Sequence, residues 1–396
     1  MTPSPPPGAP STAAPPRSRR LDALRGGPEV PQRPLDARAL SALAANPGCR
    51  RRALLDGAGV DKAAVAQALG APAPFGQSQF AFVRGNAFEA RVKADGGEAL
   101  LALLCESTGE ERPEPSAVLV PDLTADGPAG RAARTGLALA EVPAGQWALL
   151  DHPLLTLEVA GATAYLEPDA LAVHPDGGVT VIEIKSFPVL DGTVDPTKAG
   201  GAARQAAVYA LALTGSVPVR EQALLVCPKD FGNQPAGGLL DLRKPLAACR
   251  RQLARLTDLD AIADLLPEGA HFGTEQDRAA LTAAVESVPA AYAPECLATC
   301  ELAFHCRERA REAGAVEALG RSVRGELGGL RTVHEVLAAA RADADDPAAR
   351  DPAAEALRRA AALRAEALAT AAPAPAQAGT PAPPAGGGTE GGLACR

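Results

Sequence analysis

Three side chains in the middle of the chain could together support hydrolysis of a phosphodiester bond. Asp169 follows a proline, and Glu183 and Lys185 stand two positions apart further along the chain. Carboxylate oxygens are the ligands that Mg²⁺ prefers. A divalent cation lowers the pKa of a bound water and stabilises the charge of a phosphodiester under attack, while a lysine can orient that water or offset phosphate charge. These residue types therefore indicate metal-dependent hydrolysis.

A β-hairpin would bring these three residues together. Alternating apolar residues lie on both sides of Pro175-Asp176-Gly177-Gly178, a sequence typical of a tight turn. Side chains alternate along a strand, so Glu183 and Lys185 share one face while Ile184 points into the core. Pairing across the turn places Asp169 near the same face. The two carboxylates then converge, with the Ile184 carbonyl as a further oxygen ligand for a cation.

A surface ion pair is the ordinary explanation of a Glu-x-Lys sequence in a strand. Here the neighbouring residues are apolar: Val179, Val181, Ile182 and Ile184. A strand of that composition is largely buried, and charged side chains are rarely buried without a partner or a role. The pattern therefore favours a functional site over a solvated ion pair.

Two predicted helices could add residues to this site. The helix predicted over 201–214 carries Gln205 and Tyr209, which lie four residues apart and so on one face. A half-buried helix face would explain this pair if it stood alone. The helix predicted over 80–93 carries Gly85 and Glu89. These helix residues can belong to the site only if the hairpin, which lies between the two helices in the sequence, places them near Asp169 and Glu183.

The motifs resemble a known nuclease family. Asp169…Glu183-x-Lys185 resembles the pattern of the PD-(D/E)xK superfamily, and Gln205-x3-Tyr209 resembles the Q-x3-Y motif of its RecB-type branch. That branch includes CRISPR-adaptation nucleases and AddB-type helicase-nucleases. The resemblance implies an α/β fold with a restriction-endonuclease-like core, in which helices flank a mixed central sheet. It also implies that these five residues are catalytic, with Gln205 and Tyr209 supporting the metal site and the DNA.

The upstream helix departs from this branch at one position. The branch has Gly-x3-His, whose histidine binds metal, whereas Gly85-x3-Glu89 places a glutamate there. Glutamate is usual at this step in many other PD-(D/E)xK nucleases, and its oxygens bind hard cations. The resemblance thus implies that Glu89, Asp169 and Glu183 hold Mg²⁺ or Mn²⁺. The preference for Mn²⁺ is expected to be weaker than a histidine would give.

Four cysteines form a second group with chemical potential. Cys296, Cys300 and Cys306 lie within one short segment, and Cys49 stands far upstream beside three arginines. Thiolates at such spacings hold iron–sulfur clusters or Zn²⁺. Iron–sulfur members of the RecB-type branch place one cysteine before the nuclease core and three after it. The resemblance therefore implies a [4Fe–4S] cluster on these four residues, which would join the N-terminal helices to the C-terminal segment.

The cysteine spacing leaves alternatives open. The branch more often has C-x2-C at the first step of the triplet, whereas this chain has C-x3-C. Zn²⁺ could use the same thiolates, with or without His305, or the cysteines could be unligated. His305 is otherwise predicted to be a surface residue. The remaining cysteines are predicted to be bystanders: Cys105, Cys227 and Cys249 in the core, and Cys395 in the tail.

Composition limits the class of protein. The net charge of −8 argues against a protein coated in positive charge. The stretch from Arg17 to Arg52 is locally basic, which indicates either a solvated tail or an edge that contacts nucleic acid. No apolar run is long enough to cross a membrane, and the N-terminus lacks the apolar region of a secretory signal. We therefore expect a cytoplasmic protein without membrane contact.

Four regions are predicted along the chain. They are a disordered Pro/Arg-rich arm over 1–36, the nuclease domain with its iron–sulfur cap over 37–335, a helical extension over 336–370 and a disordered tail over 371–396. Helices are predicted on both sides of a break at Asn46-Pro47-Gly48, and over 60–70, 80–93, 97–107, 130–142, 201–214, 243–264, 275–288, 306–341 and 352–370. Strands are predicted at 117–123, in the two hairpin arms over 164–174 and 179–186, and at 221–230.

We therefore expect a metal-dependent DNA nuclease that acts on single strands or ends, in repair, defence or CRISPR-type processing. One alternative is a nuclease-fold subunit that has lost activity and serves in DNA binding or assembly. Another is a zinc-stapled protein without a catalytic role. The sequence contains no P-loop and no G-x-S-x-G motif. A helicase motor would therefore be a separate partner, and a serine hydrolase is not indicated.

Overall fold

The structure, a computed structural model, describes residues 19–72, 79–159, 162–230, 232–254, 259–264, 266–342 and 351–371. The chain divides into two compact units. The first contains residues 1–313 and 317–321, and the second contains residues 314–316 and 322–396. The domain boundary expected at residue 335 thus falls inside the second unit.

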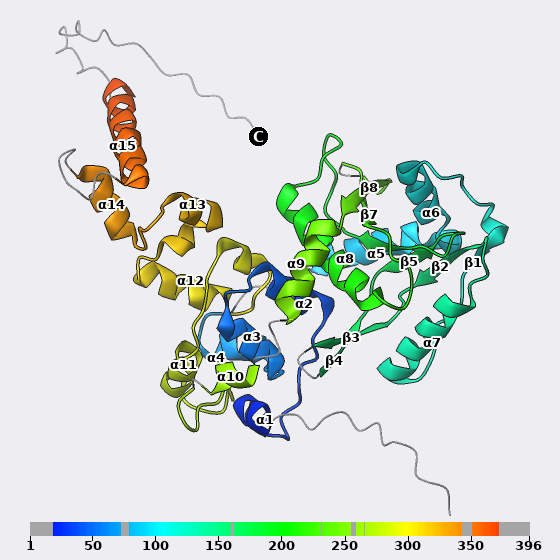
Figure 1. The fold of residues 1–396 in the computed structure, drawn as a ribbon, viewed down its shortest axis with the longest axis horizontal. Helices are drawn as coiled ribbons and strands as arrows, with labels where there is room; N and C mark the ends of the chain where they lie inside the picture. The colour runs from blue at the N-terminus through cyan, green and yellow to red at the C-terminus, as the bar shows by residue number, and fades with distance from the viewer. Residues whose placement is uncertain are drawn as a thin grey trace, which may run out of the picture. The chain divides into compact units, whose positions relative to one another are not determined.

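A mixed sheet lies at the centre of the first unit (Figure 1). In spatial order its six strands are β1 (Val118–Leu119), β2 (Trp147–Asp151), β5 (Ala170–Val173), β6 (Val179–Ile184), β7 (Gln222–Pro228) and β8 (Pro235–Asp241). The pairs β1–β2 and β6–β7 are parallel, and the other three pairs are antiparallel. The expected α/β class with a mixed central sheet is therefore confirmed.

The predicted hairpin is present, but its first arm is shorter than expected. Ala170 pairs with Ile182 and Val173 with Val179 across the turn. The residues before β5 belong to a different sheet, because β4 (Ala162–Leu166) pairs with β3 (Leu155–Val159). The chain leaves extended pairing around Pro168, which has no N–H to donate to a ladder. The expectation of one continuous strand through this region was wrong.

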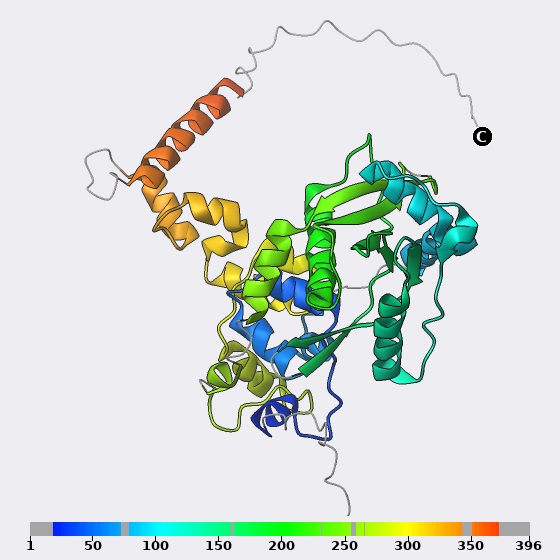
Figure 2. The same cartoon turned by 45° about the vertical axis from the view of Figure 1, so that its right-hand side comes forward.

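Helices cover both faces of the sheet (Figure 2). On one face lie α5 (Gln79–Val92) and α6 (Ala94–Thr108), whose core shares Ile182 and Ile184 of β6. On the other face lie α2 (Ala37–Ala45), α8 (Pro196–Leu213) and α9 (Arg243–Ala254), whose core shares Val179 and Val181. α7 (Gly127–Glu141) contacts β3. The odd and even residues of β6 therefore enter different cores, as the alternation of side chains requires.

A helical lobe forms the rest of the first unit. It contains α1 (Arg19–Arg25), α3 (Arg50–Gly57), α4 (Lys62–Ala68), α10 (Leu259–Ala263), α11 (Arg278–Glu286) and α12 (Ala303–Glu312). Helices from the two ends of this unit share one apolar core, in which Leu54, Leu55, Phe272 and Leu281 are fully buried. The lobe thus joins segments that are far apart in sequence.

Helix α1 lies within the region predicted as a disordered arm. Its side chains Leu21 and Leu24 are buried in the core of the lobe, so the arm is ordered from Arg19 onward. Two leucines in an otherwise polar stretch give no visible periodicity, which explains why sequence analysis missed them. Residues 1–18 lie outside the described residues.

The second unit is helical. It includes α14 (Val333–Arg341), which begins at a capping box between Thr332 and Glu335, and α15 (Pro352–Ala371), which contacts α14. The helix predicted over 352–370 is confirmed. The helical pattern predicted over 306–341 is present as several short elements: most of α12, a 3-10 turn at Val316–Leu319, α13 (Arg321–Glu326) and α14. The tail after 371 lies outside the described residues. Among the described helices, none is both long and apolar enough to span a bilayer.

The edge strand β8 was not predicted from the sequence. Pro235, Gly237 and Gly238 interrupt any alternating pattern, and such residues are tolerated on an edge strand. Strand β8 is recognised by its pairing with β7 and not by a pattern in its own sequence. The strand expected at 117–123 reduces to β1. The helix expected over 243–264 is represented by α9 up to Ala254 and by α10 from Leu259, and residues 255–258 lie outside the described residues.

The kink at the start of α6 gives a stability prediction. Gly97 has φ +78°, and a Cβ atom there would lie 2.0 Å from Cδ2 of Leu149. Gly97→Ala should therefore lower the free energy of unfolding by about 1–3 kcal/mol through strain and overpacking. Gly136→Ala in α7, where a Cβ meets nothing within 4 Å, is the control. Gly136→Ala should leave the free energy of unfolding, measured by urea denaturation, unchanged or raise it by about 0.5–1 kcal/mol. Equal effects of the two substitutions would contradict the close approach of Gly97 to Leu149.

Candidate active site

The structure brings Asp169 and Glu183 together at one end of the hairpin. Asp169 directly precedes β5, and its Oδ2 accepts a hydrogen bond from the backbone N–H of Ile184 at 2.6 Å. Glu183 lies between Ile182 and Ile184, so its side chain points to the opposite face, towards α8. The predicted convergence of the two carboxylates on one face is consistent with this register.

The carboxylate of Glu183 is fully buried. Neither of its oxygens has a well-formed hydrogen bond in the described part of the chain, and its counter-charge is the ammonium of Lys185 on the same strand. Burial raises the pKa of Glu183 to about 7, since desolvation disfavours the anion more than Lys185 favours it. Burial also raises the pKa of Asp169.

Lys185 stays charged in this surrounding. Burial alone would lower its pKa, but the nearby carboxylates of Glu183 and Asp169 outweigh burial, and the pKa of Lys185 is raised. A permanently protonated lysine can orient a water molecule or hold a phosphate oxygen, but it cannot accept a proton. A lysine in this charge state could act only through its charge.

The two carboxylates suit a hard cation. Buried carboxylate oxygens without hydrogen bonds are costly unless another positive group satisfies them. Oε1 of Glu183 faces the ammonium of Lys185, so Oε2 remains without a partner in the described residues, and Asp169 uses only Oδ2 in its bond to Ile184. Within the described ranges, however, no three histidine, cysteine, aspartate or glutamate side chains are arranged as a ready metal-binding group. The donor chemistry fits Mg²⁺ or Mn²⁺, with two carboxylates in place rather than three.

Glu89, the third expected ligand, is engaged elsewhere. Its Oε1 lies 2.6 Å from Nζ of Lys93 and 3.2 Å from Nε2 of His152. The hydrogen bond from His152, with help from Lys93, lowers the pKa of Glu89 to about 2. Lys93 also contacts Oδ1 of Asp151 at 2.8 Å. The structure thus places Glu89 in an ion cluster rather than against Asp169 or Glu183.

This ion cluster adjoins the carboxylate pair through the backbone. His152 has φ +45°, a conformation that few residues other than glycine adopt, and its N–H donates to the carbonyl of Asp169 at 3.3 Å. Strained residues of this kind gather at functional sites. Sequence reasoning missed Lys93, Asp151 and His152 as site residues. The spacing of Lys93 four residues after Glu89 was the one available signal.

Gln205 and Tyr209 form a pair on α8, as their spacing predicts. Nε2 of Gln205 donates to the hydroxyl of Tyr209 at 3.0 Å, and that hydroxyl donates to the carbonyl of Glu167 at 3.0 Å. They therefore hold the chain two residues before Asp169. Both also line an open groove of about 440 Å³, to which Arg38 and Arg131 contribute. The pair supports the site without a hydrogen bond to either carboxylate.

The four predicted cysteine ligands lie in the helical lobe. Cys49 is the residue before α3, and Cys296, Cys300 and Cys306 lie in or beside the core that α3 enters. Burial raises the pKa of the Cys306 thiol, and the charges of Cys49 and Cys296 add to this effect. Burial raises the pKa of Cys300 to about 12. The three C-terminal thiols are therefore protonated at neutral pH unless a metal or cluster displaces the protons.

Donors from the N-terminal helices reach two of these sulfurs. Nη1 of Arg51 lies 3.2 Å from Sγ of Cys306, and Nδ2 of Asn46 lies 3.4 Å from Sγ of Cys296. Such donors favour thiolate over thiol. The four cysteines are brought into one lobe, but within the described residues they are not arranged as a ready metal-binding group. Cys105, Cys227 and Cys249 are buried elsewhere, which confirms them as core residues.

Two expectations about polar residues of this lobe were wrong. His305 was expected at the surface but is 5% exposed, and burial lowers its pKa. The basic stretch from Arg17 to Arg52 is neither a solvated tail nor an open basic edge throughout, because Arg25, Arg51 and Arg52 are buried. Arg51 donates to the carbonyl of Val288 and Arg52 to that of Thr299.

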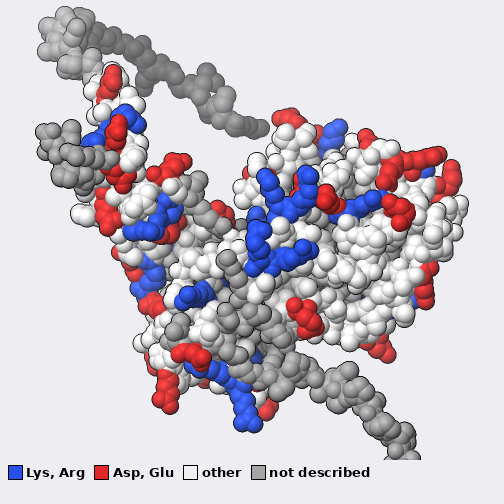
Figure 3. Space-filling view, in the orientation of Figure 1, with Lys and Arg blue, Asp and Glu red and all other residues white. Residues whose placement is uncertain are grey.

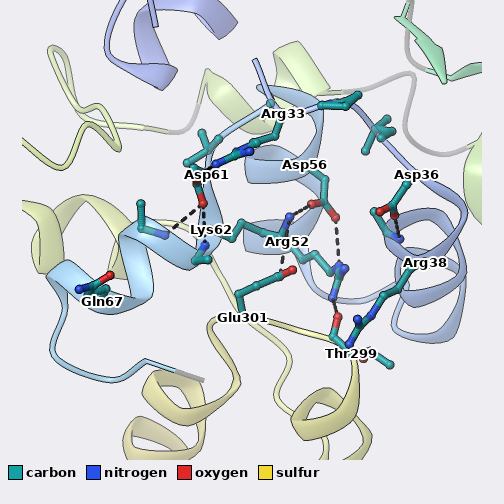
Figure 4. A pocket seen from close by; sticks show the side chains of 17 residues that line it. Arg33, Asp36, Arg38, Arg52, Asp56, Asp61, Lys62, Gln67, Thr299 and Glu301 are labelled. Carbon is teal, nitrogen blue, oxygen red and sulfur yellow. Dashed lines mark hydrogen bonds and ion pairs between the residues drawn. The ribbon is translucent and has the colours of Figure 1, made fainter. Parts of the chain in front are cut away.

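Figure 4 shows the pocket beside these arginines, with a volume of about 610 Å³. Its charges are paired within the protein. Asp56 binds both Arg52, at 3.0 Å, and Lys62, at 2.5 Å, while Arg33 pairs with Asp61. The side chain of Asp56 is 1% exposed, so this network is an internal support of the lobe.

Comparisons with known proteins leave the family open. No family model and no curated protein matches the chain. Among solved structures, that of a protein designated SSO0001 aligns at 15% identity over 48% of this chain and 84% of its own, with a TM-score of 0.17. A TM-score of that size does not establish a shared fold.

The buried Glu183 gives a pH prediction for the metal-free protein. Its pKa rises from 4.5 in the unfolded chain to about 7 in the fold, so the folded state binds more protons between these values. The free energy of unfolding should therefore fall as the pH rises from about 4.5 to 7. Glu183→Gln should flatten this dependence in urea titrations with EDTA. Substitution of the exposed Glu221 by Gln should leave the pH dependence unchanged. The same pH dependence in Glu183→Gln would contradict the raised pKa of Glu183.

Proposed function

We propose that the protein is a metal-dependent DNA nuclease with a restriction-endonuclease-like core, acting on single strands or ends. The observation that supports this most is the buried carboxylate of Glu183, paired with Lys185 and set beside Asp169 at one end of a hairpin. Burying this ion pair costs desolvation energy, and a role in holding a cation would account for keeping it in the sheet.

The residues have distinct roles in this proposal. Asp169 and Glu183, with the Ile184 carbonyl, would hold Mg²⁺ or Mn²⁺, and Glu89 would join them only by leaving its ion pair with Lys93. A bound cation supplies an activated water and stabilises charge on the phosphodiester. Lys185, which stays protonated, orients the attacking water or holds a phosphate oxygen.

The groove beside α8 would accept the substrate. Gln205 and Tyr209 fix the chain that leads into Asp169, and they line the groove together with Arg38 and Arg131. Guanidinium groups suit phosphate oxygens, because their N–H donors match the oxygen geometry. The DNA backbone would therefore lie along this groove with its scissile phosphate at the hairpin end.

The cysteines would hold a structural [4Fe–4S] cluster. Cys49 precedes α3, and Cys296, Cys300 and Cys306 come from the C-terminal segment of the same lobe. Ligation would tie two segments that are distant in sequence, which closes a long loop. Arg51 and Asn46 would stabilise the thiolates that face them.

A cleavage assay tests the activity. Labelled single-stranded DNA is incubated with the full chain and Mg²⁺ or Mn²⁺, beside Asp169→Asn and Lys185→Ala. Each substitution should lower kcat about 100-fold or more, because it removes a metal ligand or a transition-state charge. The isosteric control Glu221→Gln, at an exposed carboxylate outside the site, should cut like the wild type.

The outcomes separate the candidate functions. Equal cleavage by all four proteins would contradict the site assignment. A wild type that binds DNA but does not cut it with either metal would favour the inactive subunit over the nuclease.

A spectroscopic experiment tests the cluster. Protein purified without oxygen should be brown and should contain iron and sulfide, because thiolate-bound clusters absorb visible light. Cys300→Ala and Cys306→Ala should lose the colour, whereas Cys105→Ala and Cys249→Ala, at buried cysteines elsewhere, should keep it. A colourless protein that contains zinc would overturn the iron–sulfur proposal.

A further inference from the structure

Helix α9 carries a concentration of positive charge in an acidic protein. It contains Arg243, Lys244, Arg250 and Arg251, all exposed, although the whole chain has a net charge of −8. Figure 3 shows Lys and Arg side chains gathered over this helix. Nearby acids offset only part of this charge, because Arg243 pairs with Asp241 and lies 3.9 Å from Glu221.

The four basic residues form two rows on the helix. Arg243 and Arg250 lie seven residues apart, as do Lys244 and Arg251, so each pair lies two turns apart on nearly the same side. Each row is about 10 Å long at 1.5 Å per residue. Leu253 and Cys249 anchor another side of the helix in the core that α8 shares. The basic side is therefore fixed in orientation and faces solvent.

Three of these side chains are available to a partner. Across the described part of the chain, no ion pair joins Lys244, Arg250 or Arg251 to an acidic group. In the helical lobe, by contrast, the side chains of Arg51 and Arg52 donate hydrogen bonds to backbone carbonyls of the protein itself. Exposed, unpaired cations held on a rigid helix attract a polyanion through counterion release.

Helix α9 packs, through its buried side, against the helix that lines the substrate groove. α9 packs against α8, and Sγ of Cys249 lies 3.9 Å from the carbonyl oxygen of Arg204. The next residue of α8, Gln205, lines the groove with Tyr209. The basic surface and the groove are therefore carried by two helices that pack directly against each other.

We propose that the basic side of α9, made of Arg243, Lys244, Arg250 and Arg251, docks the phosphate backbone of DNA outside the catalytic groove. This proposal rests on the nuclease function. It assigns the binding of flanking DNA to a surface that contributes no catalytic group. Phosphate contacts position a nucleic acid without reading its sequence, so the docking is sequence-independent.

The test measures DNA binding in EDTA, so that no cleavage occurs. A fluorescent single-stranded oligonucleotide is titrated with the full chain, its Arg250→Ala/Arg251→Ala variant and its Arg250→Lys/Arg251→Lys variant. The alanine pair should weaken binding about tenfold at low salt and reduce the slope of log K against log salt by about 1.4, which corresponds to two lost contacts on a single strand. The lysine pair should keep most of the affinity.

The matched control removes the same charge from another exposed helix. Arg359→Ala/Arg364→Ala on α15 of the second unit should bind like the wild type. Wild-type affinity and slope in the α9 alanine pair would overturn the proposal, even if the wild type cuts DNA. Equal weakening by both alanine pairs would also overturn it, because net charge alone would then explain binding. Weakening by the α9 pair alone, in a chain that cuts nothing, would support the docking surface and refute the nuclease.

Discussion

The anion of Glu183, placed inside an apolar sheet, is the constraint on which the rest of the site depends. A buried carboxylate without hydrogen bonds destabilises the fold unless a positive charge lies next to it. Lys185 supplies that charge from two residues along the same strand, and the Asp169 carboxylate in turn keeps the lysine protonated. The three groups therefore stabilise one another's charge states, and a change at one alters the other two.

The hairpin and its site residues could be predicted because their signals are local. The turn at 175–178 and the alternation of β6 fix which residues share a face, and the spacing of Gln205 and Tyr209 fixes their common side on α8. The structure agrees with each of these relations. Such predictions need no knowledge of what the other side of the sheet contains.

The remaining features depend on contacts between distant segments. The partners of Glu89 are Lys93, which follows α5, and His152, which follows β2, and no spacing relates His152 to Glu89. The burial of Arg51 depends on acceptors near residue 288. Strand β8 exists because β7 pairs with it, against the preference of its own proline and glycines. Tertiary context decided these cases where local propensity gave no signal or the wrong one.

The arginines of α3 also set an order for folding during synthesis. Their contacts with Val288, Thr299 and Cys306 span 237, 247 and 255 residues of chain. Contacts of such length form slowly, and domains fold as the chain leaves the ribosome from its N-terminal end. Helix α3 is made early, and Arg52 can pair with Asp56 of the same helix at once, but the other guanidinium contacts form only after residues 288 to 306 have emerged. The central sheet, complete by residue 241, can assemble first and leave the helical lobe to close last.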